Sequence, residues 1–201
     1  GNIAGALLLT LGAGAGFGAI NGLIVAFSRA SPFILTLGSA LAFYGATQIY
    51  SGGTARGAIA PGFREFFNFR IAETLPVLAL CFIAAAVLAM LVLAGTRFGR
   101  SLYLIGSNPL AAEISGLSIV GTTLAAYILS GLLAAAGGIA LLARSGVSST
   151  FAGRGLEFDV LAAVVLGGTT FEGGRGGVAG TVAGLLVLFI AFNVVNIVGL
   201  N

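Results

Sequence analysis

Few residues of this chain could do acid–base or nucleophilic chemistry, and their spacing brings none of them together. The chain has no histidine and no lysine, and its one cysteine, Cys81, lies inside an apolar run. The six acidic residues all lie in or beside polar connections: Glu65, Glu73, Glu113, Glu157, Asp159 and Glu172. Acid–base catalysis most often uses a positioned histidine or carboxylates, and a lone cysteine builds no thiolate metal site. We therefore expect no enzyme, no metal site and no cofactor.

One pair of opposite charges interrupts an apolar stretch, in the glycine cluster GGTTFEGGRGG at 167–177. Glycine-rich backbone can cradle phosphate, but a phosphate loop also needs a lysine, so nucleotide binding is excluded. At membrane depth, glycine lets the backbone leave the helix where protein or a water-filled cavity surrounds it, as in transporters with broken helices. Glu172 and Arg175 stand three residues apart, and two interpretations stay open: a structural clasp, or a gate on a transport path.

The composition indicates the kind of fold in which these residues lie. The chain is 58% hydrophobic and 7% charged, whereas a soluble domain carries roughly a quarter charged residues. The net charge of +3 comes from nine arginines placed singly, which gives no basic face for nucleic acid. We predict an all-α fold, a polytopic transmembrane helix bundle in contact with lipid.

Five apolar stretches approach the roughly 20 residues that a spanning helix needs. They cover residues 3–27, 33–50, 76–94, 122–143 and 178–200, with Pro32 and Pro76 placed at helix entries. A sixth stretch, 159–166, is too short to cross and predicts a half-span or broken helix. We treat 1–201 as one transmembrane domain, and its abrupt ends indicate a fragment of a longer protein.

Glycines recur every four residues in two of these stretches. Small residues at this spacing form a flat face on which a second helix can pack closely in lipid. They are Gly14, Gly18 and Gly22 in the first stretch, and Gly176, Gly180 and Gly184 at the start of the last. We predict helix packing at both faces.

The polar connection 95–121 contains a short amphipathic helix, NPLAAEISGL. Asn108 is suited to cap it, Pro109 to its first position and Gly116 to its end. The five long spans contain no carboxylate, arginine, lysine or histidine, which argues against an ion-coupled carrier. A transporter of this kind needs an external motor that contacts a loop. The apolar edge of Leu110, Ile114 and Leu117 fits a partner's groove, or alternatively the lipid surface.

Four blocks of the sequence resemble the permease subunits of bacterial sugar ABC importers, the family with ribose, xylose and autoinducer-2 permeases. They are NGLIVAFSRASPFILTLGSALAFYG at 21–45, FGRSLYLIGSNPLAAEISGL at 98–117, YILSGLLAAAGGIALLAR at 127–144 and FAGRGLEFDVLAAVVLGGTTFEGGRGGVAGT at 151–181. Together they cover about half of the chain, in the family's order. Phe158, where many members have leucine, and the loosely matching loop 51–76 depart from the pattern.

The resemblance implies a multi-pass protein of the bacterial inner membrane and a set of partners. These are a second permease in a homodimer, a cytoplasmic ABC ATPase subunit, and a periplasmic or lipoprotein sugar-binding protein. It also implies further spans before Gly1 and after Asn201, and it places loop 95–121 in the cytoplasm. The arginine count of the loops favours the opposite orientation, and we follow the more specific motif.

The resemblance also implies site residues. The family's cytoplasmic G-x-N-x-x-A-A-x-x-x-G pattern makes this loop the ATPase-coupling segment, with these residues: Gly106, Asn108, Pro109, Ala111, Ala112, Glu113 and Gly116. We assign the translocation path or gate to Pro32, Phe33 and Thr36 together with Glu172 and Arg175. Two other functions stay open: a branched-chain amino-acid ABC permease, and a passive channel or membrane scaffold.

Overall fold

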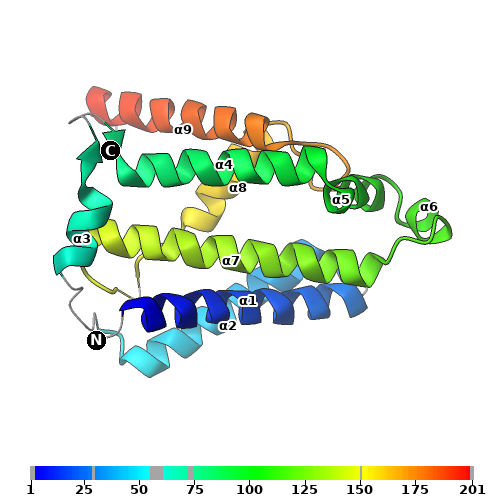
Figure 1. The fold of residues 1–201 in the computed structure, drawn as a ribbon, viewed down its shortest axis with the longest axis horizontal. Helices are drawn as coiled ribbons and strands as arrows, with labels where there is room; N and C mark the ends of the chain where they lie inside the picture. The colour runs from blue at the N-terminus through cyan, green and yellow to red at the C-terminus, as the bar shows by residue number, and fades with distance from the viewer. Residues whose placement is uncertain (1–2, 29, 55–60, 72–74, 150, 200–201) are drawn as a thin grey trace. The chain divides into compact units, whose positions relative to one another are not determined.

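The computed structural model describes residues 3–28, 30–54, 61–71, 75–149 and 151–199, and it is helical almost throughout (Figure 1). The helices, in chain order, are α1 Ile3–Phe27, α2 Pro32–Ser51, α3 Pro61–Asn68, α4 Val77–Gly95, α5 Arg97–Ser107, α6 Pro109–Ile114, α7 Ile119–Ser145, α8 Leu156–Leu166 and α9 Val178–Val198. Two two-residue strands, β1 Arg70–Ile71 and β2 Leu75–Pro76, pair antiparallel before α4.

Five helices of the described residues are long and apolar enough to cross a membrane: α1, α2, α4, α7 and α9. The predicted all-α, multi-pass fold is therefore confirmed. Helix α7 is longer than expected because the Ser118 side chain accepts a hydrogen bond from the Gly121 nitrogen and so starts the helix early. It ends at Ser145, and the following Gly146 has the left-handed backbone (φ 76°) that is usual after a helix C-terminus.

The connection 51–76, expected to be a loop, contains α3 and the strand pair. Pro76 does not open a helix as predicted: it is the last residue of β2, and α4 begins one residue later at Val77.

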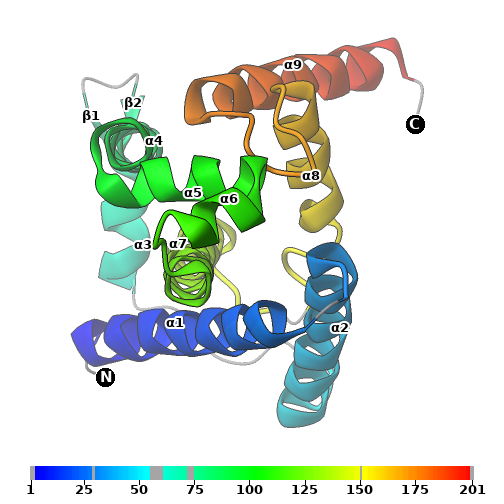
Figure 2. The same ribbon diagram turned by 90° about the vertical axis from the view of Figure 1, so that its right-hand side faces the viewer.

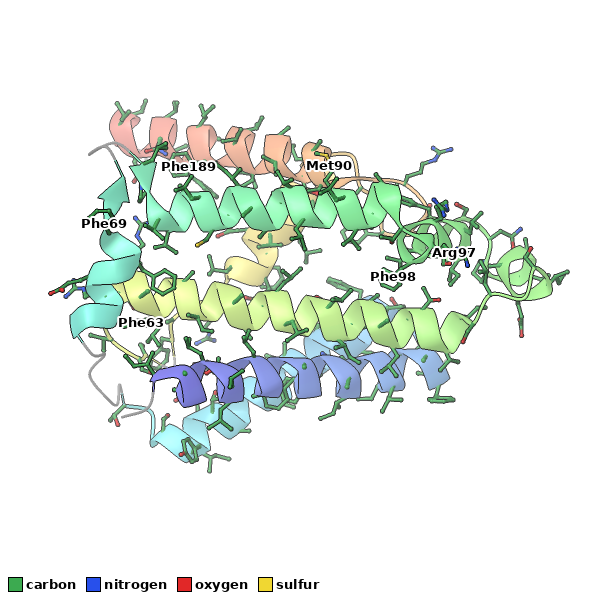
Figure 3. The ribbon with its side chains drawn as sticks, in the orientation of Figure 1. Phe63, Phe69, Met90, Arg97, Phe98 and Phe189 are labelled. Atoms are coloured by element: carbon green, nitrogen blue, oxygen red, sulfur yellow. The ribbon has the colours of Figure 1, made fainter. Side chains whose placement is uncertain are left out.

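Phe63 and Phe67 lie one turn apart on α3, with ring centroids 4.8 Å apart. Phe63, labelled in Figure 3, lines a small apolar cavity with Ile139 and Leu142 of α7. A short amphipathic helix of this kind suits a membrane surface.

The contacts within the chain divide it into two units. The first contains α1, α2, α3 and α7, and the second contains α5, α6, α8, α9 and most of α4. In the first unit α1 and α7 lie side by side in both views (Figures 1 and 2). A Cβ at Gly14, Gly18 or Gly22 would meet Gly131, Tyr127 and Leu124 in turn. Since the partner numbers fall as the glycine numbers rise, the two helices run antiparallel at backbone contact.

In the second unit α8 is a short helix that packs across the start of α9. Its 11 residues extend for about 16 Å at 1.5 Å per residue, about half of a ~30 Å hydrocarbon core. It starts at Leu156, three residues before the predicted start of this half-span. A Cβ at Gly180 would overlap the Gly167 carbonyl, and one at Gly184 the Ala163 carbonyl. These two glycines therefore bring α9 into backbone contact with the end of α8.

Side-chain burial is low throughout the described residues. Apart from glycines, the buried apolar residues in the described part of the chain are Ala112, Ala143 and Ala163, and no large side chain there is fully buried. Large apolar side chains of the spanning helices, such as Leu9, Leu91 and Phe189, are more than half exposed. A water-soluble domain hides such side chains in a core. Here lipid or further protein must cover them.

Candidate coupling site

Two capping residues define the polar segment that follows α4. The Thr96 hydroxyl accepts a hydrogen bond from the Gly99 nitrogen at 3.1 Å and starts α5. Asn108 then ends α5 and starts α6: its side-chain oxygen accepts from the Ala111 nitrogen at 3.0 Å, and Pro109 occupies the first helical position. Because the Asn108 backbone is extended (φ −157°, ψ 96°), the chain changes direction between the two helices.

Helix α6 ends in a Schellman motif. The Leu117 nitrogen donates to the Ala112 carbonyl at 3.1 Å, and the Gly116 nitrogen donates to the Glu113 carbonyl at 2.9 Å. Gly116 takes the left-handed conformation (φ 78°) that this motif requires and that glycine adopts without a Cβ penalty. Both ends of this six-residue helix are therefore fixed by its own sequence.

Helix α6 carries an exposed apolar surface and one buried alanine. Leu110 is 67% exposed and Ile114 81% exposed, with Pro109, Ala111 and Glu113 also exposed. Ala112 is only 4% exposed, so it faces its own chain and is not available to a partner. The surface open to a partner consists of Leu110 and Ile114 around Glu113.

The turn between α8 and α9 is closed by Thr170 rather than by the charge pair. The Thr170 nitrogen donates to the Arg175 carbonyl at 3.3 Å, and its hydroxyl donates to the Gly173 carbonyl at 3.0 Å. The side chains of Glu172 and Arg175 are both exposed, and the described residues show no ion pair between them. Gly176 lies in this turn with φ 130°, so it is not part of the helical face that holds Gly180 and Gly184.

Helix α5 packs directly on this turn. The Tyr103 hydroxyl donates to the Gly176 carbonyl at 2.9 Å, and a Cβ at Gly106 would overlap the Gly174 nitrogen. Figure 2 shows α5 beside the loop that joins α8 to α9. Gly106 was predicted as part of the coupling pattern, and the structure gives a physical reason for its lack of a side chain. Tyr103 was not predicted, since no local pattern marks a contact 73 residues away along the chain.

The residues assigned to the translocation path belong to both units of the chain. Thr36 lines a groove between α1, α2 and α7 in the first unit, whereas Pro32 and Phe33, one turn earlier on α2, are exposed and do not line it. Glu172 and Arg175 belong to the second unit. No cluster of three potential metal ligands exists among the residues that the structure describes.

Spanning helices, a half-length helix that turns back at glycine and a capped polar helix with an exposed apolar surface are the features of a multi-pass membrane protein. The chain belongs to the family described as the permease component of branched-chain amino acid transport systems, whose model matches residues 1–201.

Several relatives of the chain are named as sugar import permeases. It is 38% identical over 202 residues to the ribose import permease of Escherichia coli strain K12, covering 98% of this chain and 62% of the relative. It is 36% identical to the ribose import permease of Bacillus subtilis, over 90% of this chain and 56% of the relative. It is 32% identical to the galactose/methyl galactoside import permease of Haemophilus influenzae, over 97% of this chain and 60% of the relative.

The chain thus spans about 60% of the length of these relatives. No solved structure shows a significant match to it.

Proposed function

We propose that this chain belongs to the permease subunit of an ABC importer, which moves a small sugar across the bacterial inner membrane by alternating access. The observation that carries the proposal is the similarity of nearly the whole chain to ribose and galactose import permeases. The family description mentions branched-chain amino acids, but the named relatives favour a sugar.

The proposed partner at α6 is a separate ATPase subunit on the cytoplasmic side. An exposed apolar pair on a rigidly capped helix, Leu110 and Ile114, is the kind of anchor that fits a partner's hydrophobic groove.

Helix α4 separates this segment from α3 and the strand pair along the chain. If α4 crosses the bilayer, α3 faces outward, where a soluble sugar-binding protein would dock. A second permease copy would complete the transport path as a homodimer.

The contacts of α5 support a way for movement of the ATPase subunit to reach the membrane helices α8 and α9. Movement of α6 would act on α5 through Asn108, which belongs to the caps of both helices. Helix α5 holds the turn at 167–177 through Tyr103 and Gly106, and that turn joins the half-length α8 to α9. Closure of the ATPase subunits would then shift α8 against α9. We therefore retain the residues of the family pattern as the proposed ATPase-coupling segment. In this proposal Ala112 supports α6 from its buried side.

Uptake by cells tests the choice of substrate. Cells that lack their own ribose, galactose and branched-chain amino acid importers would express the complete transporter and be given radiolabelled ribose, galactose or leucine. We expect uptake of one of the sugars and none of leucine. Leucine uptake without sugar uptake would assign the protein to the amino-acid class, and entry of all three solutes without an ATPase subunit would indicate a channel.

A further inference from the structure

A groove of about 650 Å³ lies between α1, α2 and α7, within the first unit. This volume is within the usual 300–1,000 Å³ range of small-molecule sites. Its floor is formed by small residues such as Gly14, Gly18 and Gly131, where α1 and α7 touch through their backbones. Larger side chains stand around the floor and give the groove its chemistry: Phe17, Asn21, Thr36, Phe43, Tyr127 and Ser130.

Three of these side chains carry polar groups without a hydrogen-bond partner among the described residues: the Asn21 amide, the Tyr127 hydroxyl and the Ser130 hydroxyl. Thr36 donates to the Pro32 carbonyl at 2.9 Å, which leaves a lone pair of its oxygen free to accept. Polar side chains within spanning helices are costly unless they are paired, and they commonly mark a solute pathway. Unpaired donors and acceptors from three different helices therefore converge on one groove.

An aromatic surface lies at the same groove. The rings of Phe17 on α1 and Phe43 on α2 are tilted by 42° with centroids 4.4 Å apart, and both line the groove. Small-molecule sites commonly combine such apolar surface with a few placed polar groups. A sugar ring has a matching division, because its C–H groups form an apolar face and its hydroxyls donate and accept around the edge.

The lining also discriminates between classes of solute. None of the described residues that line the groove carries a charge. A free amino acid has a carboxylate and an ammonium group, whose removal from water without charged partners is costly. A neutral solute with several hydroxyls has no such cost. The groove therefore suits a sugar better than a branched-chain amino acid, and this argument is independent of the names of the relatives.

We propose that this groove is a sugar-contact site of the permease, in which the hydroxyls of a monosaccharide bond to Asn21, Thr36, Tyr127 and Ser130 while its C–H face packs on Phe17 and Phe43. This proposal rests on the proposed function, because it names the residues that a sugar meets on its way through. The proposed polar contacts come from three helices, with Asn21 on α1, Thr36 on α2, and Tyr127 and Ser130 on α7. A shift of these helices relative to one another would therefore change the affinity of the site for the sugar.

The test measures uptake by the complete importer with Tyr127→Phe and Asn21→Leu, each with a matched control. Tyr44→Phe removes a hydroxyl from α2 outside the groove, where it accepts a hydrogen bond from Gln48 at 2.7 Å. Asn193→Leu removes an amide from α9 that donates to its own helix at the Phe189 carbonyl. Radiolabelled ribose or galactose is compared with analogues that each lack one hydroxyl. Variant uptake is divided by wild-type uptake for each sugar, so the selectivity of the binding protein cancels.

We expect Tyr127→Phe and Asn21→Leu to lower uptake of the complete sugar about three- to tenfold, as expected for one lost hydrogen bond, and the controls to leave it unchanged. For an analogue without the hydroxyl that the side chain contacts, the ratio should return toward one. A ratio that is the same for every analogue would overturn the sugar contact, even if uptake falls, because a packing defect affects all sugars alike. If the wild-type importer carries no sugar, the proposed function fails as well.

Discussion

The Tyr103 hydroxyl donates a hydrogen bond to the Gly176 carbonyl, with 2.9 Å between the two oxygens. This bond joins α5, which precedes the exposed helix α6, to the turn between the half-length α8 and α9. Gly106 lies one turn after Tyr103, and its missing side chain lets α5 approach the Gly174 backbone. The segment proposed to receive the ATPase stroke is thus in direct contact with the turn proposed to move.

Tyr103→Phe tests the hydrogen bond alone, because it keeps the ring. We expect a loss of about 1 kcal/mol in the free energy of unfolding, together with slower ATP-driven uptake, since the turn is held less firmly to α5. Thermal denaturation in detergent and uptake in vesicles measure the two effects. Tyr50→Phe is the control because Tyr50 is 90% exposed. Equal behaviour of Tyr103→Phe and the control would contradict the role of this bond.

Gly106→Ala tests the close approach of α5 to the turn. The added methyl would overlap the Gly174 nitrogen, and overpacking of this kind costs about 1–3 kcal/mol. The matched control is Gly16→Ala in α1, where a Cβ has no neighbour within 4 Å; there the better helix propensity of alanine should stabilise by about 0.5–1 kcal/mol. The two variants should therefore shift the denaturation midpoint in opposite directions, and a shift in the same direction would refute the contact.

Gly180→Leu tests the packing of α9 on α8. The side chain would have to displace the Gly167 carbonyl, so we expect poor recovery of folded protein and lost uptake. Gly137→Leu in α7 is the control because a Cβ there meets nothing within 4 Å. Normal expression and uptake of Gly180→Leu would show that the two helices do not need this contact.

Asn108→Ala tests the cap that α6 shares with α5. Loss of the bond from the Ala111 nitrogen should cost about 0.5–2 kcal/mol and loosen a helix of only six residues. We expect faster proteolysis within residues 108–117 and weaker binding of the ATPase subunit. Asn108→Asp keeps an acceptor oxygen at the same place and should behave like the wild type, whereas rapid cleavage of both variants would assign another role to the amide.

The spans and the caps were predictable because their signals are local. Runs of about 20 apolar residues mark the helices, and Asn108, Pro109 and Gly116 mark the ends of α6 without reference to the rest of the chain. The amphipathic pair Phe63 and Phe67 also gave a local signal for α3, which the loop interpretation of residues 51–76 overlooked. Helix boundaries shifted by a few residues where a side chain such as Ser118 extended a helix.

Contacts between distant segments could not be predicted from the sequence. Nothing near Tyr103 indicates that its hydroxyl bonds to Gly176, and an alanine such as Ala112 has no strong preference between a buried and an exposed place. The opposite charges of Glu172 and Arg175 suggested a clasp, but hydrogen bonds from the Thr170 nitrogen and hydroxyl close the turn instead. Such features depend on how helices pack, which no single stretch of sequence encodes.

ATP-driven sugar uptake into proteoliposomes tests the central claim most directly. The complete importer, with its ATPase subunits and binding protein, would carry either the wild-type permease or Ile114→Arg, which places a charge in the exposed apolar surface of α6; Ile114→Val is the conservative control. We predict that wild-type and Ile114→Val vesicles accumulate ribose or galactose only with ATP and binding protein, and that Ile114→Arg vesicles do not. Sugar entry without ATP, or wild-type uptake by Ile114→Arg, would contradict the account.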